Sequence, residues 1–188
     1  MNFLKEIPNT LTIIRVAMIP LILLTFYFDD SIFSHQFGAF LFFIAAITDF
    51  LDGHLARKFN LQSGFGEIMD NIADKILIVT TLVMLVKFRK INEVPALLII
   101  SREFLVSGLR EVLVEINKKI EVSLIAKFKT TIQMFAIFFL ILGSKGSNIE
   151  FLDLIGQIFL WIAAFLTLFS GYDYVKKFFF LYKKKNIF

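Results

Sequence analysis

Residues 36–57 read QFGAFLFFIAAITDFLDGHLAR, an apolar segment with two aspartates close to its end. A bilayer hydrocarbon core about 30 Å thick requires about 20 predominantly apolar residues for one helical crossing. The segment has this length, so it predicts a membrane-spanning helix. Its two acidic residues, Asp49 and Asp52, then lie near one end of that helix, close to a membrane surface.

Apolar segments of similar length occur along the whole chain. Of the 188 residues, 57% are hydrophobic, and the mean hydropathy of +0.76 argues against an ordinary soluble domain. The stretches between the apolar segments are too short to hold a soluble domain. The sequence therefore predicts an all-α integral membrane protein with a single membrane domain, residues 1–188. The six predicted transmembrane helices cover residues 8–28, 36–57, 67–87, 93–115, 127–143 and 151–175.

The positions of lysine and arginine predict the orientation in the membrane. Short cytoplasmic loops are enriched in these residues, and six helices place both termini on the same side. Most of the basic residues fall on that side, which we therefore expect to be the cytoplasm. Lys87, Arg89 and Lys90 fall on the opposite side. The basic tail is expected to anchor the chain at the membrane rather than to bind nucleic acid.

Four aspartates carry the strongest functional signal. Asp49 and Asp52 are three residues apart and Asp70 and Asp74 are four apart, so each pair shares one face of a helix. The short connection makes the two helices antiparallel neighbours, so the pairs can face each other. Four unpaired aspartates at membrane depth would cost on the order of 10 kcal/mol, which bound divalent cations would remove. The chain has no cysteine and its two histidines lie on different segments, so oxygen ligands favour Mg²⁺ or Mn²⁺, with Ca²⁺ less favoured.

Residues beside the aspartates suggest contacts with a bulky ligand. Gly53 and Gly66 lack a Cβ, so a ligand or a neighbouring helix can approach closely, and helix packing is the more frequent reason for such glycines. Arg57 can bind a phosphate through two hydrogen bonds. An arginine at this position also serves to anchor a helix at the cytoplasmic surface.

The segment from Asp49 to Asp74 follows the pattern Asp-x2-Asp-Gly-x2-Ala-Arg-x8-Gly-x3-Asp-x3-Asp. This pattern resembles the signature of the CDP-alcohol phosphatidyltransferases. The resemblance implies a six-helix membrane protein, usually a homodimer, with a polar cavity that faces the cytoplasm. It also implies that Asp49 and Asp70 bridge two metal ions, that Asp52 binds one of them, and that Asp74 binds the other and acts as general base. The residues implied for binding CDP-diacylglycerol are Asn9, Thr12, Asp52, Gly53, Arg57, Ser63 and Gly66.

Other segments are similar to the bacterial phosphatidylglycerophosphate synthases within this family. Residues 7–12, IPNTLT, and residues 101–110, SREFLVSGLR, carry this similarity. Asn71 and Ala126 depart from the subfamily pattern, in which proline and glycine are usual. The similarity implies glycerol 3-phosphate as the acceptor and a location in the bacterial inner membrane, with both termini and the active site on the cytoplasmic side.

Four basic residues are candidates for binding the phosphate of the acceptor. Arg102 and Arg110 are eight residues apart, which places them about 80° apart around a helix, so both could reach one cavity and bind a dianionic phosphate. Alternatively, they form a structural network with the nearby glutamates Glu103, Glu111 and Glu115. Lys127 and Lys129 are two residues apart, so only one of them can point inward, and the pattern leaves open which.

The hypothesis that results is transfer of the phosphatidyl group from CDP-diacylglycerol to glycerol 3-phosphate, with release of CMP. One alternative is a same-family enzyme with another acceptor, such as a cardiolipin, phosphatidylserine or phosphatidylinositol-phosphate synthase. A remote alternative is a cation transporter, because carboxylates within a membrane also line ion pathways. A transporter needs carboxylates across the whole membrane, whereas here they gather near one edge.

Overall fold

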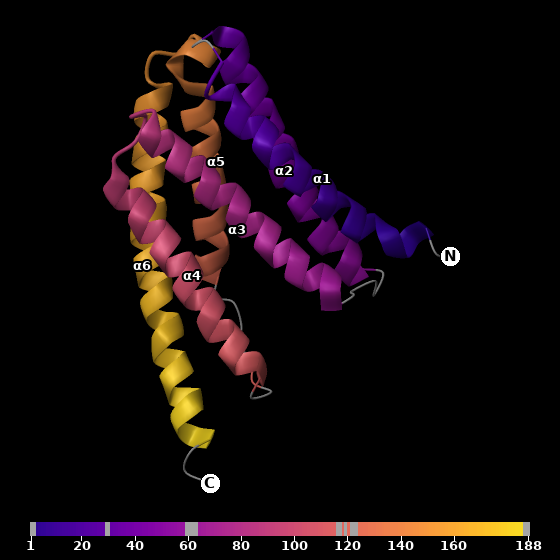
Figure 1. The fold of residues 1–188 in the computed structure, drawn as a ribbon. Coiled ribbons are helices and arrows are strands. Elements are labelled where there is room, and N and C mark those ends of the chain that lie inside the picture. Colours follow the sequence, from indigo (N-terminus) through magenta and orange to yellow (C-terminus); the bar gives the residue numbers. More distant parts are fainter. Residues whose placement is uncertain are drawn as a thin grey trace. The chain divides into compact units, whose positions relative to one another are not determined.

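A computed structural model of the chain describes the backbone of residues 3–28, 31–58, 64–115, 118, 120 and 124–185. Side chains are described for the same residues except 3–11, 49–58, 64–68, 124 and 184–185. All regular secondary structure in this described part is helical (Figure 1), which confirms the all-α prediction. The helices are α1 (Phe3–Thr25), α2 (Ile32–Lys58), α3 (Gly64–Lys87), α4 (Glu93–Glu115), α5 (Leu124–Ser147) and α6 (Leu152–Lys185).

Side-chain caps mark the start of two helices. The Oδ1 atom of Asn92 accepts a hydrogen bond from the backbone N–H of Val94 at 2.8 Å, at the start of α4. The Oγ atom of Ser31 accepts one from the backbone N–H of Ser34 at 3.2 Å, at the start of α2. Such caps satisfy backbone donors that have no partner within the helix, so these polar residues fix where the apolar helices begin.

The largest difference from the predicted boundaries is at the end of α6. This helix has 34 residues and is about 51 Å long, whereas the apolar pattern alone predicted an end at residue 175. No glycine or proline follows Gly171, so nothing in the local sequence breaks the helix. The apolar pattern shows where a helix can lie in lipid, and the helix itself continues through the basic tail.

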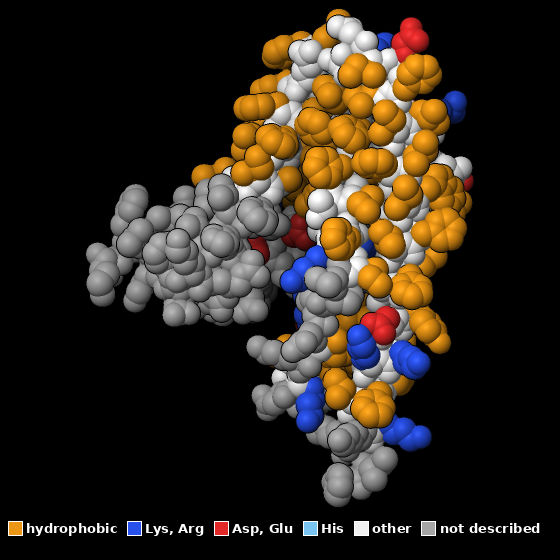
Figure 2. Space-filling model, turned by 180° about the vertical axis from the view of Figure 1, so that it is seen from behind, with side chains coloured by type: hydrophobic (Ala, Val, Ile, Leu, Met, Phe, Trp, Pro, Cys, Tyr) orange, Lys and Arg blue, Asp and Glu red, His pale blue; other side chains and the backbone are white. Residues whose placement is uncertain are grey.

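The surface of the described helices is strongly apolar. The segments Ile125–Ser147 and Leu152–Lys183 are each long and apolar enough to cross a membrane. Phe165 and Phe180 are each 71% exposed, and Figure 2 shows apolar side chains over most of the described part of one face. Large continuous apolar surfaces are rare on soluble monomers, so this surface is typical of a protein surrounded by lipid.

The chain forms two compact units, and α5 and α6 contribute to both of them. Unit 1 comprises Met1–Lys90 and Ile137–Gly156, and unit 2 comprises Ile91–Ala136 and Gln157–Phe188. The expectation that residues 1–188 form a single domain stays a prediction.

In unit 1, α1 packs against both α2 and α3. Ile22 of α1, Phe42 of α2 and Leu77 of α3 are among its fully buried side chains. This packing brings one face of α1 against the helix that carries Asp70 and Asp74. In unit 2, the helices α4 and α6 share an apolar cluster of Val106, Leu113, Tyr174 and Phe178.

Gly143 interrupts α5 within unit 1. Its backbone has φ 61° and ψ 176°, a conformation that favours glycine because it has no Cβ. A Cβ at this position would lie 3.0 Å from Oδ1 of Asp153. The Oδ2 atom of the same carboxylate accepts a hydrogen bond from the backbone N–H of Ser144 at 3.0 Å. The predicted helix end at residue 143 thus coincides with a real break, after which a short helical stretch continues to Ser147.

A polar group lies at the end of unit 1 where α5 ends and α2 begins. The Nδ1 atom of His35 lies 2.8 Å from the carbonyl oxygen of Ile141 and 3.0 Å from Nζ of Lys90. Burial lowers the pKa of Lys90, and the carboxylate of Asp153 acts in the opposite direction. His35 and Lys90 also line a cavity of about 410 Å³, together with Thr25, Phe26, Tyr27, Phe28, Ser34, Phe88 and Ile141.

Candidate active site

Helix α3 carries two of the four candidate metal ligands. Asp70 and Asp74 lie one turn apart near its start, on the same face. The side chain of Asp70 is 37% exposed, and Asp74 is half-buried. Both side chains are therefore held on one side of a well-packed helix and are partly accessible, although Oδ1 of Asp74 is buried.

Arg15 of α1 contacts Asp70, one member of this pair. Its side chain is fully buried, and Nη1 donates a hydrogen bond of 2.8 Å to Oδ1 of Asp70. The packing of α1 against α3 makes this contact possible. A buried arginine on an apolar helix requires such a partner, because an unpaired buried charge is costly. The guanidinium therefore compensates the charge of Asp70 and fixes the position of its side chain.

Sequence reasoning gave Arg15 no role. The available signal was an arginine inside the apolar segment 8–28, since charged residues within membrane segments usually face polar partners. Thr12 lies three residues earlier on the same face of α1 and is 3% exposed. Whether this buried threonine also binds CDP-diacylglycerol stays a prediction.

Asp49 and Asp52 lie in the last turns of α2, and their side chains are outside the described residues. Residues 59–63 join α2 to α3, and this connection spans at most about 20 Å. Asp49 lies about 14 Å along the helix from the end of α2, and Asp70 about 9 Å from the start of α3. Both acidic pairs therefore belong to the two helix ends that this short connection joins.

Most of the other predicted ligands of the metal and of CDP-diacylglycerol lie outside the described side chains. Among the side chains that the structure describes, no three or more His, Cys, Asp or Glu residues form a metal-binding group. Of the four predicted metal ligands, Asp70 and Asp74 belong to these described side chains. The structure does not describe the side chains or surroundings of seven predicted site residues, namely Asn9, Asp49, Asp52, Gly53, Arg57, Ser63 and Gly66.

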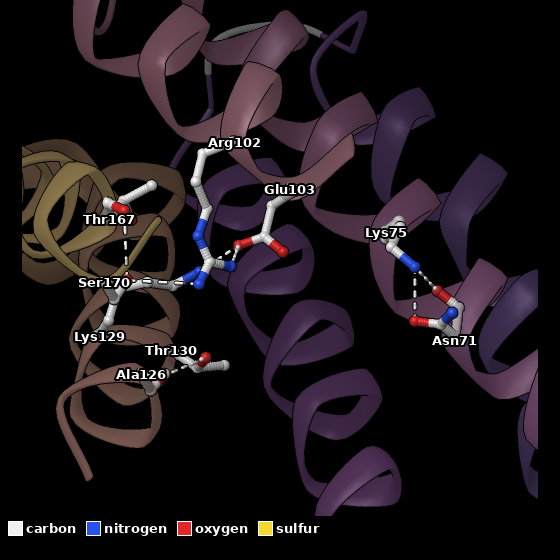
Figure 3. Close-up of polar contacts among 9 residues, drawn as sticks. All are labelled: Asn71, Lys75, Arg102, Glu103, Ala126, Lys129, Thr130, Thr167 and Ser170. Atoms are coloured by element: carbon white, nitrogen blue, oxygen red, sulfur yellow. Dashed lines mark hydrogen bonds and ion pairs between the residues drawn. The ribbon is translucent and has the colours of Figure 1, made fainter. Parts of the chain in front are cut away.

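Asn71 is a departure from the subfamily pattern, and its surroundings are described. The Nζ atom of Lys75 donates a hydrogen bond of 3.2 Å to its main-chain oxygen and a second one to its side-chain oxygen. Figure 3 shows both contacts. The asparagine thus provides an acceptor, one turn before Lys75 on α3, that a proline side chain could not provide.

A second polar site lies in unit 2, on α4, α5 and α6. The Oε1 atom of Glu103 contacts both Nη1 of Arg102, at 3.5 Å, and Nζ of Lys129. The Nη2 atom of Arg102 donates a hydrogen bond of 3.3 Å to Oγ of Ser170. Figure 3 shows these side chains converging from the three helices. Among the described residues, the two cations and one carboxylate give this largely buried cluster a net charge of +1, which suits an anionic ligand.

Gly171 makes room for the arginine of this cluster. A Cβ on Gly171 would lie 3.0 Å from Cγ of Arg102 and 3.6 Å from its Nε. The missing side chain therefore allows the stem of Arg102 to lie against α6, where its head group reaches Ser170.

The four predicted phosphate-binding residues differ in exposure to solvent. Lys129 is 2% exposed and the side chain of Arg102 is 13% exposed, whereas Lys127 and Arg110 are exposed. Lys129 is therefore the inward-pointing lysine that the sequence left undetermined. The alternative of a structural network is present in part, because Arg102 pairs with Glu103.

Comparison with known proteins identifies the class of this chain. The family model described as CDP-alcohol phosphatidyltransferase matches residues 5–169. The chain belongs to the CDP-alcohol phosphatidyltransferase family. It is therefore a transferase of a membrane-associated family, as its sequence predicted.

Individual relatives are similar over nearly the whole chain. A protein of Rickettsia bellii is 54% identical over 172 residues, which cover 92% of this chain and 94% of the relative. A Bacillus subtilis protein is 37% identical, with 92% and 94% covered, and a Haemophilus influenzae protein is 39% identical, with 91% and 92% covered. All three are named CDP-diacylglycerol–glycerol-3-phosphate 3-phosphatidyltransferase.

Proposed function

We propose that this protein transfers the phosphatidyl group of CDP-diacylglycerol to glycerol 3-phosphate, giving phosphatidylglycerophosphate and CMP. The observation that carries the proposal is the 54% identity over 92% of the chain to a relative named for this reaction. The buried cluster of Arg102, Glu103 and Lys129 supports it independently. A phosphorylated acceptor requires cations of this kind, whereas neutral inositol or zwitterionic serine does not.

The same proposal includes the setting of the reaction. Six membrane-spanning helices in a single domain would surround a polar cavity open to the cytoplasm, in the inner membrane of a bacterium. Both termini would lie on the cytoplasmic side, and two chains would form a homodimer. The apolar exposed surface supports the membrane setting, and the basic end of α6 supports the orientation.

The four aspartates provide a donor set that fits divalent metal ions. Carboxylate oxygens are the ligands that Mg²⁺ and Mn²⁺ prefer, and the two described members lie one turn apart on one face of α3. We assign Asp49, Asp52, Asp70 and Asp74 as the residues that would hold two such ions. The bound ions would supply positive charge against the diphosphate of the donor.

The protein's own residues would position the reactants and move one proton. CDP-diacylglycerol would be bound by Asn9, Thr12, Asp52, Gly53, Arg57, Ser63 and Gly66. The phosphate of the acceptor would be bound by Arg102 and Lys129. Arg15 would hold Asp70 in place through the 2.8 Å hydrogen bond. These contacts would align the acceptor hydroxyl with the phosphorus atom that carries diacylglycerol.

Asp74 would then accept the proton of the acceptor hydroxyl. The hydroxyl oxygen would form a bond to that phosphorus, the bond from phosphorus to the bridging oxygen would break, and CMP would leave with the bridging oxygen. No covalent intermediate with the protein is needed. No reactant besides the two substrates is consumed, and the proton of the acceptor hydroxyl passes to Asp74.

The proposal is tested by product analysis. Purified protein in liposomes that contain CDP-diacylglycerol is given glycerol 3-phosphate and Mg²⁺, and the lipids are identified by mass spectrometry. Phosphatidylglycerophosphate should form with the unaltered protein and with Asp173→Asn, which changes an aspartate whose side chain is 43% exposed and paired with Lys177. It should be absent with Asp74→Asn. Formation of a different phosphatidyl lipid from another acceptor would move the protein to another subfamily.

A further inference from the structure

Gln133 of α5 is a buried amide with an unusual environment. It is 0% exposed, and among the residues that the structure describes neither Oε1 nor Nε2 of its side chain has a hydrogen-bond partner. The large majority of buried side-chain polar atoms in folded proteins have such a partner. A buried amide whose oxygen and nitrogen both lack a hydrogen-bond partner therefore indicates a ligand that supplies the partners. A position with a purely structural role would favour an apolar side chain.

The location of Gln133 shows which ligand it would meet. It follows Lys129 by four residues, so the two side chains lie one turn apart on the same face of α5. Lys129 is buried and bound to Glu103, which also contacts Arg102 (Figure 3). Gln133 is thus adjacent to the cations that we assign to the acceptor phosphate.

Two other buried polar side-chain atoms of unit 2 also lack a hydrogen-bond partner among the described residues. Nε of Arg102 and Oγ1 of Thr167 are buried and, within the described part of the chain, have no hydrogen-bond partner. Thr167 is 0% exposed, and its main-chain oxygen accepts a hydrogen bond of 3.2 Å from Oγ of Ser170, which contacts Arg102. Buried polar atoms without a hydrogen-bond partner therefore occur on several side chains of unit 2. Such a group of atoms is expected at a site that binds a polar ligand.

The chemistry of an amide matches a hydroxyl group. The amide oxygen accepts and the amide nitrogen donates, and a hydroxyl group can do both. Glycerol 3-phosphate has a phosphate, the hydroxyl that attacks and a middle hydroxyl that does not react. We propose that Gln133 binds the middle hydroxyl of the acceptor and thereby selects glycerol 3-phosphate over acceptors without it. This inference rests on the proposed function, because it assigns a specificity-determining residue to that reaction.

The test compares two acceptors and two variants. The acceptors are glycerol 3-phosphate and 3-hydroxypropyl phosphate, which lacks the middle hydroxyl. Gln133→Met removes both polar atoms and keeps an unbranched side chain of similar length. Gln157→Met, at an exposed position of α6, is the matched control. The kcat/KM of CMP release is measured for each pair, together with the thermal unfolding midpoint of each purified protein.

The unaltered protein should prefer glycerol 3-phosphate by about tenfold or more, because a site built for a hydroxyl disfavours an analogue that leaves its polar groups unpaired. In Gln133→Met this ratio should fall to near one, while the unfolding midpoint stays the same or rises. The Gln157→Met control should keep both the ratio and the midpoint.

Three results would overturn the inference. The unaltered protein could use both acceptors equally well, the ratio could persist in Gln133→Met, or Gln133→Met could lower the unfolding midpoint or fail to fold, which would show a structural role. A different outcome tests the proposed function: the absence of any CMP release with glycerol 3-phosphate would overturn that function and this inference together.

Discussion

The ion pair between Arg15 and Asp70 should stabilise unit 1 far more than an exposed ion pair of similar length. The two atoms in contact are 2.8 Å apart, the arginine is fully buried and the aspartate is 37% exposed. Two charges about 4 Å apart attract by about 4 kcal/mol at an effective dielectric constant of 20. Partial exposure of Asp70 and the desolvation of Arg15 reduce this value. We expect a coupling free energy of about 2 kcal/mol, within the range of charged hydrogen bonds.

A double-mutant cycle measures this coupling. Arg15→Met, Asp70→Asn and the double variant are compared with the unaltered protein by thermal unfolding in detergent. The cycle is needed because Arg15 has further interactions, which a single substitution would include. For a chain of this size, 2 kcal/mol corresponds to about 4–8 °C in the unfolding midpoint.

The matched control is the pair of Lys177 and Asp173 on α6. Its contact is 2.6 Å long, but the side chains are 48% and 43% exposed, so its coupling should be at most about 0.5 kcal/mol. Equal couplings in the two cycles, or a coupling below about 0.5 kcal/mol for Arg15 and Asp70, would refute the reasoning from burial.

Three further outcomes are expected. Lys129→Met should raise the KM for glycerol 3-phosphate by about 10- to 100-fold, because a charged hydrogen bond is lost. Lys127→Met, at an exposed position, should change this KM by no more than about twofold. Equal effects of the two substitutions in acceptor titrations would contradict the assignment of Lys129 as the inward lysine. Gly143→Ala should lower the unfolding midpoint by about 2–4 °C, because a residue with a Cβ at a φ of 61° costs about 1 kcal/mol. An unchanged midpoint in a thermal scan would show that the backbone at residue 143 adopts another conformation without cost. Chelation of divalent ions by EDTA should abolish CMP release, and added Mg²⁺ or Mn²⁺ should restore it. Activity that persists in EDTA would contradict the assignment of the four aspartates as metal ligands.

The helices could be predicted from the sequence because each apolar segment has the length that a membrane requires. Helix α4 begins and ends where it was predicted, at residues 93 and 115. Helix α6 was predicted ten residues too short, because hydropathy reports the fit to lipid and not the tendency to remain helical. The break at Gly143 was visible as an end of the apolar run, but the cap from Asp153 was not, since it joins residues nine apart through a turn.

The acidic motif could be found from spacing alone, because residues three or four apart on a helix share a face. The partners of that motif could not. Arg15 is 55 residues away from Asp70, and only the packing of α1 against α3 brings them together. Spacing also showed that one of Lys127 and Lys129 faces inward, but the rotation of α5, which decides between them, is set by contacts with other helices.

The central claim is tested most directly by CMP release from CDP-diacylglycerol by the purified protein with Mg²⁺ or Mn²⁺. Glycerol 3-phosphate, serine, inositol and phosphatidylglycerol are compared as acceptors, and Asp74→Asn is the control. Release should depend on glycerol 3-phosphate and should be lost in Asp74→Asn. Release that depends on another acceptor would contradict the proposed reaction, and undiminished release by Asp74→Asn would contradict its role as the base.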